Sequence, residues 1–236
     1  MATIKPQPVS GFPEYLPEIR AVEQKWLDHI RSVFESYGYC SIETPAVEIL
    51  EALLAKGETD KEIYTLNRLQ AEANDADQKE GRLGLHFDLT VPLARYTAQH
   101  FNDLVFPFKR YQMQKVWRGE RPQLGRMREF RQCDIDVINV DHLPLHFDAE
   151  MPAVIHEALS GLDLGRVQIR ISNRKILLGL LDEIGTEDSV AITRIIDKQD
   201  KIGREDMRHE LQQECQLSLV AVERICDLLD SDIDAI

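Results

Sequence analysis

The stretch "FKRYQMQKVWRGERPQLGRMREFRQCDIDV", residues 108–137, decides the fold class. Its first ten and last eight residues are rich in the aromatic and β-branched side chains typical of strands. The residues between them are dominated by arginine, proline and glycine, as in an exposed loop. Two strands joined by so short a connection pair antiparallel. The sequence therefore predicts a hairpin at the centre of an α+β domain, a mainly antiparallel sheet flanked by helices.

The second strand of this hairpin has two unlike faces, because successive side chains point to opposite sides of a sheet. One face is mostly apolar. The other face carries an aromatic ring, an amide and two carboxylates: Phe130, Gln132, Asp134 and Asp136. We interpret the polar face as the lining of a binding site. A solvated face of a half-exposed antiparallel strand is the alternative.

The loop is basic although the chain is acidic. The formal net charge is −13, yet eight basic and only two acidic residues lie between Lys109 and Arg131. Guanidinium groups bind phosphate oxygens in a fixed fork geometry, and an aromatic ring such as Phe130 can stack on a base. Neither a P-loop nor a G-x-G-x-x-G motif occurs. The loop is therefore a candidate nucleotide site in which arginines and metal ions hold the phosphates, with a solvated hairpin tip as the alternative.

Secondary-structure patterns on both sides of the hairpin divide the chain into two domains. Residues 1–173 mix helices and strands, whereas residues 174–236 contain helical patterns alone and predict a second, helical module. In the first domain we expect helices at 17–37, 90–101 (with Thr90 as its cap) and 148–160, and strands at 39–45, 62–66, 82–89 and 167–172, with a polar hairpin tip at 70–81. In the second we expect helices at 174–185, 189–198, 204–215 and 218–230.

Composition excludes several classes of protein. No apolar run reaches the ~20 residues that span a bilayer, and the first ten residues lack the apolar core of a secretory signal. Four widely spaced cysteines without a C-x-x-C pair fit neither a zinc site nor a disulfide framework. We therefore expect a cytoplasmic protein with no membrane contact, with reduced and mostly buried thiols and no metal held by protein side chains.

Several segments in order resemble the histidyl-tRNA synthetase family. Residues 108–137 resemble the second signature motif of class II aminoacyl-tRNA synthetases in the form of that family. "LPEIRAVEQKW" through "YGYCSIETPAVE" is similar to the first motif, and "HFDLTVPLARY" to the amino-acid-binding segment. "PVSGFPEYLP" is similar to the amino-terminal opening, and "ISNRKILLGLLDEIG" with "IIDKQDKIG" to the start of the helical insertion. The likeness covers most of residues 8–140 and implies a catalytic core at 1–173 and an incomplete insertion at 174–236.

The resemblance implies a role for individual residues. Arg118 would hold the α-phosphate of ATP and stabilise the transition state, as the catalytic residue. For ATP, the resemblance further implies that Glu120 contacts the adenine amino group, Arg126 the outer phosphates, and Phe130 stacks on adenine. For histidine, it implies that Asp88, Thr90 and Gln132 bind the α-amino group and Asp136 the imidazole. Arg121 and Gln123 would contact the tRNA acceptor end, and Pro45 would lie in the dimer interface.

The resemblance also implies a reaction and partners. The histidine carboxylate would attack the α-phosphorus of ATP, release pyrophosphate, and leave an adenylate whose histidyl group is transferred to tRNA(His). ATP and Mg²⁺ are the implied cofactors, Mg²⁺ neutralising the phosphates, and a homodimer is the implied assembly. An acceptor such as Asp136 in a closed pocket would penalise side chains that offer no donor.

The sequence departs from the family pattern at two points. His86 stands where an arginine is expected, and we expect it to pack in a strand without a catalytic role. The third motif, with its ATP-binding arginine, and the anticodon-binding domain are not found before Ile236. The chain is therefore expected to be the amino-terminal part of a longer enzyme, with little or no activity by itself.

Two other functions are alternatives. The first is a regulatory paralogue that binds histidine without charging tRNA, in the complex of ATP phosphoribosyltransferase. The presence of Arg118, Glu120, Arg126 and Phe130 speaks against it. The second is a nucleic-acid-binding module that uses the basic hairpin; the acidic remainder of the chain speaks against it, since such binding needs many phosphate contacts.

Overall fold

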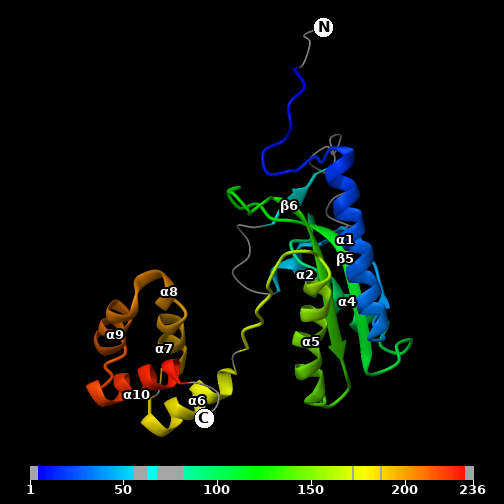
Figure 1. Cartoon of the computed structure of the whole chain (residues 1–236). Coiled ribbons are helices and arrows are strands. Elements are labelled where there is room, and N and C mark those ends of the chain that lie inside the picture. Colours follow the sequence, from blue (N-terminus) through cyan, green and yellow to red (C-terminus); the bar gives the residue numbers. More distant parts are fainter. Residues whose placement is uncertain (1–4, 56–62, 68–81, 172, 187, 232–236) are drawn as a thin grey trace. The chain divides into compact units, whose positions relative to one another are not determined.

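The computed structural model describes residues 5–55, 63–67, 82–171, 173–186 and 188–231 (Figure 1). The chain divides into two compact units, Met1–Ile169 and Arg170–Ile236, which are treated separately below. The first contains strands and helices, and the described part of the second contains helices alone. The α+β class predicted from the sequence is confirmed.

A long antiparallel hairpin dominates the first unit. Strands β5 (Phe108–Trp117) and β6 (Glu129–Ile138) pair along all ten residues of each (green in Figure 1). Strand β1 (Cys40–Ser41) pairs parallel with β5, so the strand order is β1-β5-β6. The two strands expected on either side of the basic loop are therefore present. The strand expected at 39–45 is shorter than predicted, with two residues.

Helices α1 (Pro17–Ser36) and α5 (His146–Ser160) pack with the apolar face of this hairpin. Tyr111 is at the centre of the packing: its ring lies 5.8 Å from that of Phe34, and its hydroxyl donates to Glu35 over 2.7 Å. The buried cluster comprises Val33, Phe34, Tyr39, Tyr111, Val154 and Ala158, with Met113, Cys133, Ile135 and Val137 against it. These partly buried strand residues occupy alternate positions, as the strand period requires.

A smaller sheet lies in the segment that precedes β5. Its strands are β2 (Val47–Ile49), β4 (Leu83–Leu85) and β3 (Thr65–Leu66), in the order β2-β4-β3, with both pairs antiparallel. Helices α2 (Leu50–Leu54) and α4 (Thr90–Gln99) accompany it. The strands expected at 62–66 and 82–89 form over two and three residues only. The polar insert at 70–81 lies outside the described residues.

Two local predictions are wrong. Thr90 does not cap α4; it is the first helical residue, and the Asp88 carboxylate accepts the hydrogen bond from the Val91 amide at 3.1 Å. Residues 167–171 are not a strand, although valine and isoleucine favour one. Strand formation needs a neighbouring strand to pair with, and within the described residues none pairs with this segment.

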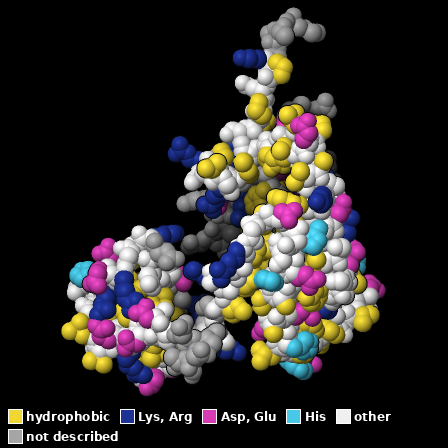
Figure 2. All heavy atoms as spheres, viewed as in Figure 1, with side chains coloured by type: hydrophobic (Ala, Val, Ile, Leu, Met, Phe, Trp, Pro, Cys, Tyr) yellow, Lys and Arg dark blue, Asp and Glu magenta, His cyan; other side chains and the backbone are white. Residues whose placement is uncertain are grey.

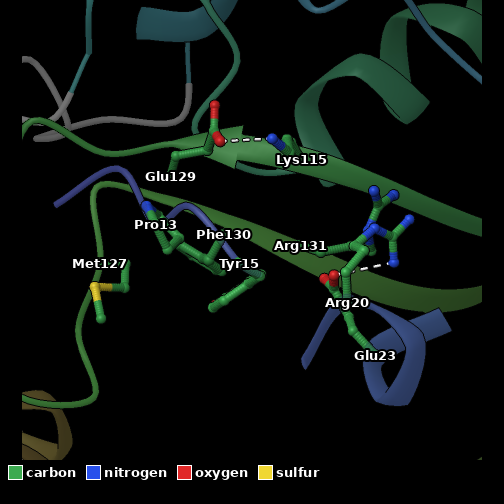
Figure 3. A pocket seen from close by; sticks show the side chains of 9 residues that line it. All are labelled: Pro13, Tyr15, Arg20, Glu23, Lys115, Met127, Glu129, Phe130 and Arg131. Atoms are coloured by element: carbon green, nitrogen blue, oxygen red, sulfur yellow. Dashed lines mark hydrogen bonds and ion pairs between the residues drawn. The ribbon is translucent and has the colours of Figure 1, made fainter. Parts of the chain in front are cut away.

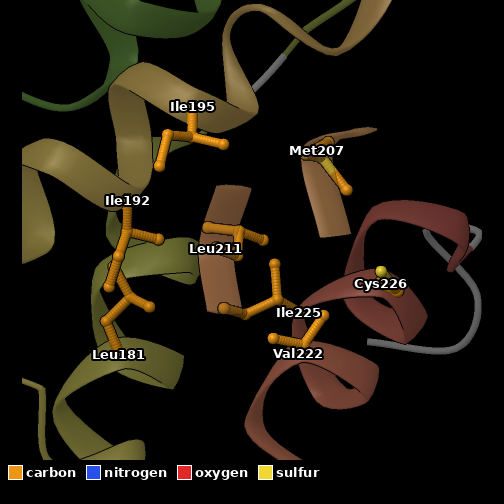
Figure 4. Packing of buried hydrophobic residues seen from close by; sticks show 8 residues of the cluster. All are labelled: Leu181, Ile192, Ile195, Met207, Leu211, Val222, Ile225 and Cys226. Atoms are coloured by element: carbon orange, nitrogen blue, oxygen red, sulfur yellow. The ribbon is translucent and has the colours of Figure 1, made fainter. Parts of the chain in front are cut away.

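The second unit is a helical bundle with its own core. It consists of α6 (Arg174–Ile184), α7 (Ser189–Ile196), α8 (Gln199–Ile202), α9 (Arg204–Gln213) and α10 (Leu219–Asp230). Asn173, Asp188 and Ser218 cap the amino ends of three helices with their side chains, which is why these helices begin where they do. Their apolar faces meet in one buried cluster (Figure 4): Leu181, Ile192, Ile195, Met207, Leu211, Val222, Ile225 and Cys226.

None of the described helices is long and apolar enough to cross a membrane. All four cysteines are free thiols. Their predicted burial is wrong for Cys40, which is exposed, whereas Cys226 is buried and Cys133 and Cys215 are half-buried.

Candidate functional site

The face of the hairpin opposite the apolar cluster is a row of polar pairs. In the register of β5 and β6, Arg110 lies across from Asp136, and Gln112 across from Asp134. The next pairs along the same face are Gln114 with Gln132 and Val116 with Phe130. Directly opposed residues in an antiparallel pair place their side chains on the same face. Both strands therefore contribute to the polar face that the sequence predicts for β6 alone.

Arg110 is the most unusual member of this row. It is fully buried, with 0% of its surface exposed, and its Nη2 forms an ion pair with the Asp136 carboxylate. Its Nη1 makes a long hydrogen bond of 3.5 Å to the backbone oxygen of Asp134. Its Nε is buried and has no hydrogen-bond partner. A buried arginine is stable only when its charge is compensated, and Asp136 supplies that compensation.

Burial also shapes the ionisation of the two carboxylates. Burial raises the pKa of Asp136 above its ordinary value, and the charge and hydrogen bond of Arg110 oppose this rise. Burial likewise raises the pKa of Asp134, and the negative charges of Asp136 and Asp88 add to this rise. The positive charges of Arg110 and Arg118 oppose it. These interactions place Asp88 and Arg118 within the electrostatic reach of the polar face.

Arg118 connects the loop to this face. It follows the last residue of β5, and its Nε donates to the backbone oxygen of Phe87 over 3.1 Å. Its guanidinium carbon lies 5.0 Å from the centre of the Phe130 ring, within the range of a cation–π contact. A positive group and an aromatic ring are thus held side by side where the two strands end.

Glu120 and Arg126 lie in the loop and bind each other. The Arg126 Nη2 donates to a Glu120 carboxylate oxygen over 2.6 Å, and its Nε forms a second ion pair with the same carboxylate. Arg128 adds a hydrogen bond from its Nε to the Glu120 backbone oxygen at 3.0 Å. At the tip, Gln123 and Arg126 exchange two backbone hydrogen bonds of 3.0 Å. The loop is therefore a closed, internally paired hairpin.

The segment that precedes α4 lies beside the end of β5. Trp117 donates its amide to the backbone oxygen of His86 over 3.1 Å. The His86 ring is fully buried, its Nε2 lies 2.8 Å from the Lys115 backbone oxygen, and its centre lies 5.5 Å from that of Trp117. His86 thus packs inside the fold. Asp88 is buried, whereas Thr90 is exposed.

The predicted site residues fall into three groups in the structure. Arg118, Phe130 and Asp88 come together with Gln132 and Asp136 around the polar face; the buried Oε1 of Gln132 has no hydrogen-bond partner. Glu120 and Arg126 are paired in the loop. Exposed positions hold the third group: Thr90 at the start of α4, Arg121, Gln123 and Pro45, the last between β1 and β2.

Sequence reasoning missed the half of the polar face that β5 supplies. Gln112 is fully buried and donates from its Nε2 to the Thr44 hydroxyl over 2.8 Å. Gln114 donates to the Thr44 backbone oxygen over 2.8 Å and accepts from the Thr44 amide at 3.1 Å. The signal was the alternation of Arg110, Gln112 and Gln114 with larger apolar residues in residues 108–117.

A hollow of about 230 Å³ lies at the start of β6 and shares Phe130 with the polar face (Figure 3). Two ion pairs, Arg20 with Glu23 at 3.0 Å and Lys115 with Glu129 at 2.6 Å, neutralise four of its charged groups. The full lining is Pro13, Tyr15, Arg20, Glu23, Lys115, Met127, Glu129, Phe130 and Arg131. Arg131 is the remaining charged residue of the lining.

An exposed apolar patch covers the start of α1. Figure 2 shows hydrophobic side chains gathered in this part of the face it presents. The exposed residues are Tyr15, Leu16, Ile19, Val22 and Trp26. Contiguous exposed apolar surface of this kind is typical of protein contacts.

No group of three or more histidine, cysteine, aspartate or glutamate side chains in the described part of the chain could hold a metal ion. A divalent cation that accompanies nucleotide phosphates needs few protein ligands, because Mg²⁺ keeps its waters and binds the phosphates themselves.

The arginine-bearing hairpin, its polar face and the surrounding α+β elements define the fold of a class II aminoacyl-tRNA synthetase. The family model for histidyl-tRNA synthetase matches residues 11–226. The chain belongs to the histidyl-tRNA synthetase family.

Relatives agree with this assignment. The chain is 62% identical over 215 residues to the histidine–tRNA ligase of Thermobifida fusca (strain YX). The aligned region covers 91% of this chain and 49% of that protein. The crystal structure of histidyl-tRNA synthetase from Nostoc sp. PCC 7120 matches with a TM-score of 0.85 and 42% identity, over 98% of this chain and 50% of that one. The chain spans about half the length of the curated relatives it matches.

A second solved structure shares the fold alone. It is described as an ATP phosphoribosyltransferase regulatory subunit/histidyl-tRNA synthetase from Bacillus halodurans C, with a TM-score of 0.76 and 23% identity, over 96% of this chain and 57% of that one. At this identity the match carries no information on activity.

Proposed function

We propose that this chain carries the ATP- and histidine-binding surface of a histidine–tRNA ligase. The observation that carries the proposal is the convergence of Arg118, Phe130 and Asp88 on the polar face of β5 and β6. Membership of the histidyl-tRNA synthetase family supports the identity of the amino acid.

ATP would bind at the loop end of the hairpin. Arg118 would hold the α-phosphate, since its guanidinium is fixed by Phe87 on one side and by the Phe130 ring on the other. Phe130 would stack on adenine, Glu120 would accept from the adenine amino group, and Arg126 would bind the outer phosphates. The last two roles require the Glu120–Arg126 pair to open when ATP arrives. Mg²⁺ would enter with the phosphates.

Histidine would bind further along the same face. Asp88, Thr90 and Gln132 would hold its α-amino group; the buried, unpartnered Oε1 of Gln132 is an acceptor available to an N–H donor. Asp136 would accept a hydrogen bond from the imidazole. The histidine carboxylate would then form a bond to the α-phosphorus while the bond to the leaving pyrophosphate breaks, and Arg118 would stabilise the charge that develops.

The remaining partners follow from the exposed residues. Arg121 and Gln123 would meet the acceptor end of tRNA(His), since both are exposed in the loop. A homodimer would form around Pro45 and the exposed apolar patch at the start of α1. The free thiols fit a reducing compartment, which supports a cytoplasmic location.

The first test is calorimetric titration of the chain with each of the twenty amino acids. The chain is then titrated with ATP, and ATP–pyrophosphate exchange is measured in the presence of each amino acid. We expect histidine to bind at least ten times more tightly than any other amino acid, since a mismatched polar site costs about 1–3 kcal/mol. Preference for another amino acid would contradict the proposal. Histidine binding without ATP binding would favour the regulatory paralogue.

A further inference from the structure

The polar face contains a charged group for which the proposed reaction gives no role, namely Arg110. It is fully buried, yet it belongs to neither the loop nor the apolar cluster. Its guanidinium reaches two neighbours on β6, the Asp136 carboxylate and the Asp134 backbone oxygen. Stabilisation of the sheet alone does not explain a buried arginine at this position, because a buried ion pair often stabilises a fold no more than an apolar pair of similar volume.

We infer that Arg110 is a positioning residue that fixes the Asp136 carboxylate for recognition of the imidazole. This inference rests on the proposed function, since it concerns the amino-acid pocket. Arg110 would not touch the substrate. It would act through Asp136, by holding one carboxylate oxygen and leaving the other to accept from an imidazole N–H.

The geometry supports these separate roles, in which Arg110 holds the carboxylate and Asp136 contacts the ligand. The side chain of Arg110 is completely covered, whereas that of Asp136 is 36% exposed, so a ligand can reach the carboxylate but not the guanidinium. The two residues lie directly opposite in the β5–β6 register, which fixes the distance between their backbones. Both strands are regular along this part.

Electrostatics adds a second function for the same contact. Burial raises the pKa of Asp136, and Arg110 opposes that rise. Asp134 on β6 also interacts with both residues. Burial and the hydrogen bond to Glu150 raise the pKa of Tyr39, before β1, and the Asp136 charge adds to that rise. Without Arg110, burial raises the pKa of Asp136 further, so a larger fraction of Asp136 is protonated at any given pH. A protonated carboxyl loses the negative charge that favours an N–H donor.

The first experiment is calorimetric titration of the whole chain with histidine at pH 7. R110M keeps most of the buried volume but removes the charge, and we expect it to weaken histidine binding by about ten-fold or more, the effect of one pKa unit or one lost charged hydrogen bond. R110K keeps a positive charge and should recover part of the loss. ATP binding should be unaffected, because its proposed residues lie at the other end of the face.

A matched control separates this effect from general destabilisation. Lys109, next to Arg110 on β5, forms an ion pair with the Glu150 carboxylate at 2.7 Å, and its side chain is on the face of the strand opposite to Arg110. K109M therefore removes an ion pair from the same strand without changing the polar face. We expect K109M to lower the melting temperature while the histidine dissociation constant stays within two-fold of the wild type.

A spectroscopic measurement tests the ionisation directly and needs no ligand. The infrared carbonyl band of protonated Asp136, identified as the part of the band that is lost in R110M/D136N, should persist to higher pH in R110M than in the wild type. Its loss should occur as the pH is raised, because the carboxyl releases its proton above its pKa. In the wild type the same band should appear only at lower pH.

The outcomes are distinguishable. A wild-type chain that does not prefer histidine would overturn the proposed function and this inference with it. A wild type that binds histidine, with R110M equal to it in affinity and in the infrared spectrum, would overturn the inference alone. Equal losses of histidine affinity in R110M and K109M would also overturn it, since both would then report stability.

Discussion

The two faces of the β5–β6 hairpin are formed by alternate residues of the same two strands, but their side chains have different surroundings. One face packs Tyr111, Met113 and Ile135 with the buried residues of α1 and α5. The other presents Arg110, Gln112 and Asp136, which are paired with one another or with Thr44 rather than with apolar side chains. Packing therefore stabilises one face, whereas the other face buries polar groups that cost stability, and these are the groups that the proposed function uses to bind a ligand.

The largest expected effect comes from the apolar face. Tyr111→Ala should lower the free energy of unfolding by about 3–5 kcal/mol, because it leaves a cavity beside Phe34. Urea unfolding followed by tryptophan fluorescence measures this, since Trp26 and Trp117 both lie in the first unit. Tyr111→Phe removes only the hydroxyl bond to Glu35 and should cost about 1 kcal/mol or less. Similar losses in both variants would show that cavity formation does not dominate.

A smaller effect is expected at the edge of the same face. Lys109 forms an ion pair with Glu150 at 2.7 Å, and Tyr39 donates to that carboxylate over 2.7 Å. Burial pushes the pKa of Glu150 up, but these two hydrogen bonds outweigh it and leave the pKa below its ordinary value.

Stability from a lowered carboxyl pKa is present at neutral pH and is lost as the pH falls through the folded-state pKa. Lys109→Met should therefore cost about 1–2 kcal/mol at pH 7. The difference from the wild type should shrink below about pH 4. Unfolding curves across pH 3–7 measure it, and a constant difference over that range would contradict the pairing.

The polar face should respond in the opposite way. Gln132→Met removes a buried Oε1 that has no partner, so stability should stay equal or rise. Histidine binding should weaken by about ten-fold, since one hydrogen bond to a charged amino group is lost. Thermal unfolding and calorimetry on the same sample give both values. A loss of stability without a loss of binding would reverse the distinction between the two faces.

The smallest effect is chemical. Cys133 is on the apolar face, and burial raises its pKa to about 11, so little reactive thiolate exists at pH 8. Cys40 is exposed. Iodoacetamide should label Cys40 well before Cys133, as peptide mass spectrometry can follow. Equal rates would mean that the apolar face opens readily.

The sequence predicted the alternation of side chains along β6, but not which residues of β5 lie opposite them. Alternation within 130–137 predicted the polar face of β6, because the strand period is local information. The burial of Arg110 depends on Asp136, 26 residues further along, and only the strand register brings the two together. The cap of α4 was misassigned to Thr90, which is its first helical residue: Leu89 is at the N-cap, and the Asp88 carboxylate before it accepts from the Val91 amide at 3.1 Å.

The error at 167–171 has a related cause. Valine and isoleucine favour a strand locally, yet strand formation depends on an available neighbour. Four helices of the second unit, α6, α7, α9 and α10, were predicted because helical hydrogen bonds are internal to each segment and three caps, Asn173, Asp188 and Ser218, stand in the sequence. The four-residue helix α8 was not predicted.

A crystal structure of the chain with histidine and a non-hydrolysable ATP analogue would show directly which residues bind each ligand. We expect the imidazole beside Asp136, the α-amino group at Gln132 and Asp88, and the adenine against Phe130, all on the polar face of β5 and β6. Histidine bound elsewhere, for example in the hollow lined by Arg20 and Glu129, with the polar face unchanged, would contradict this expectation.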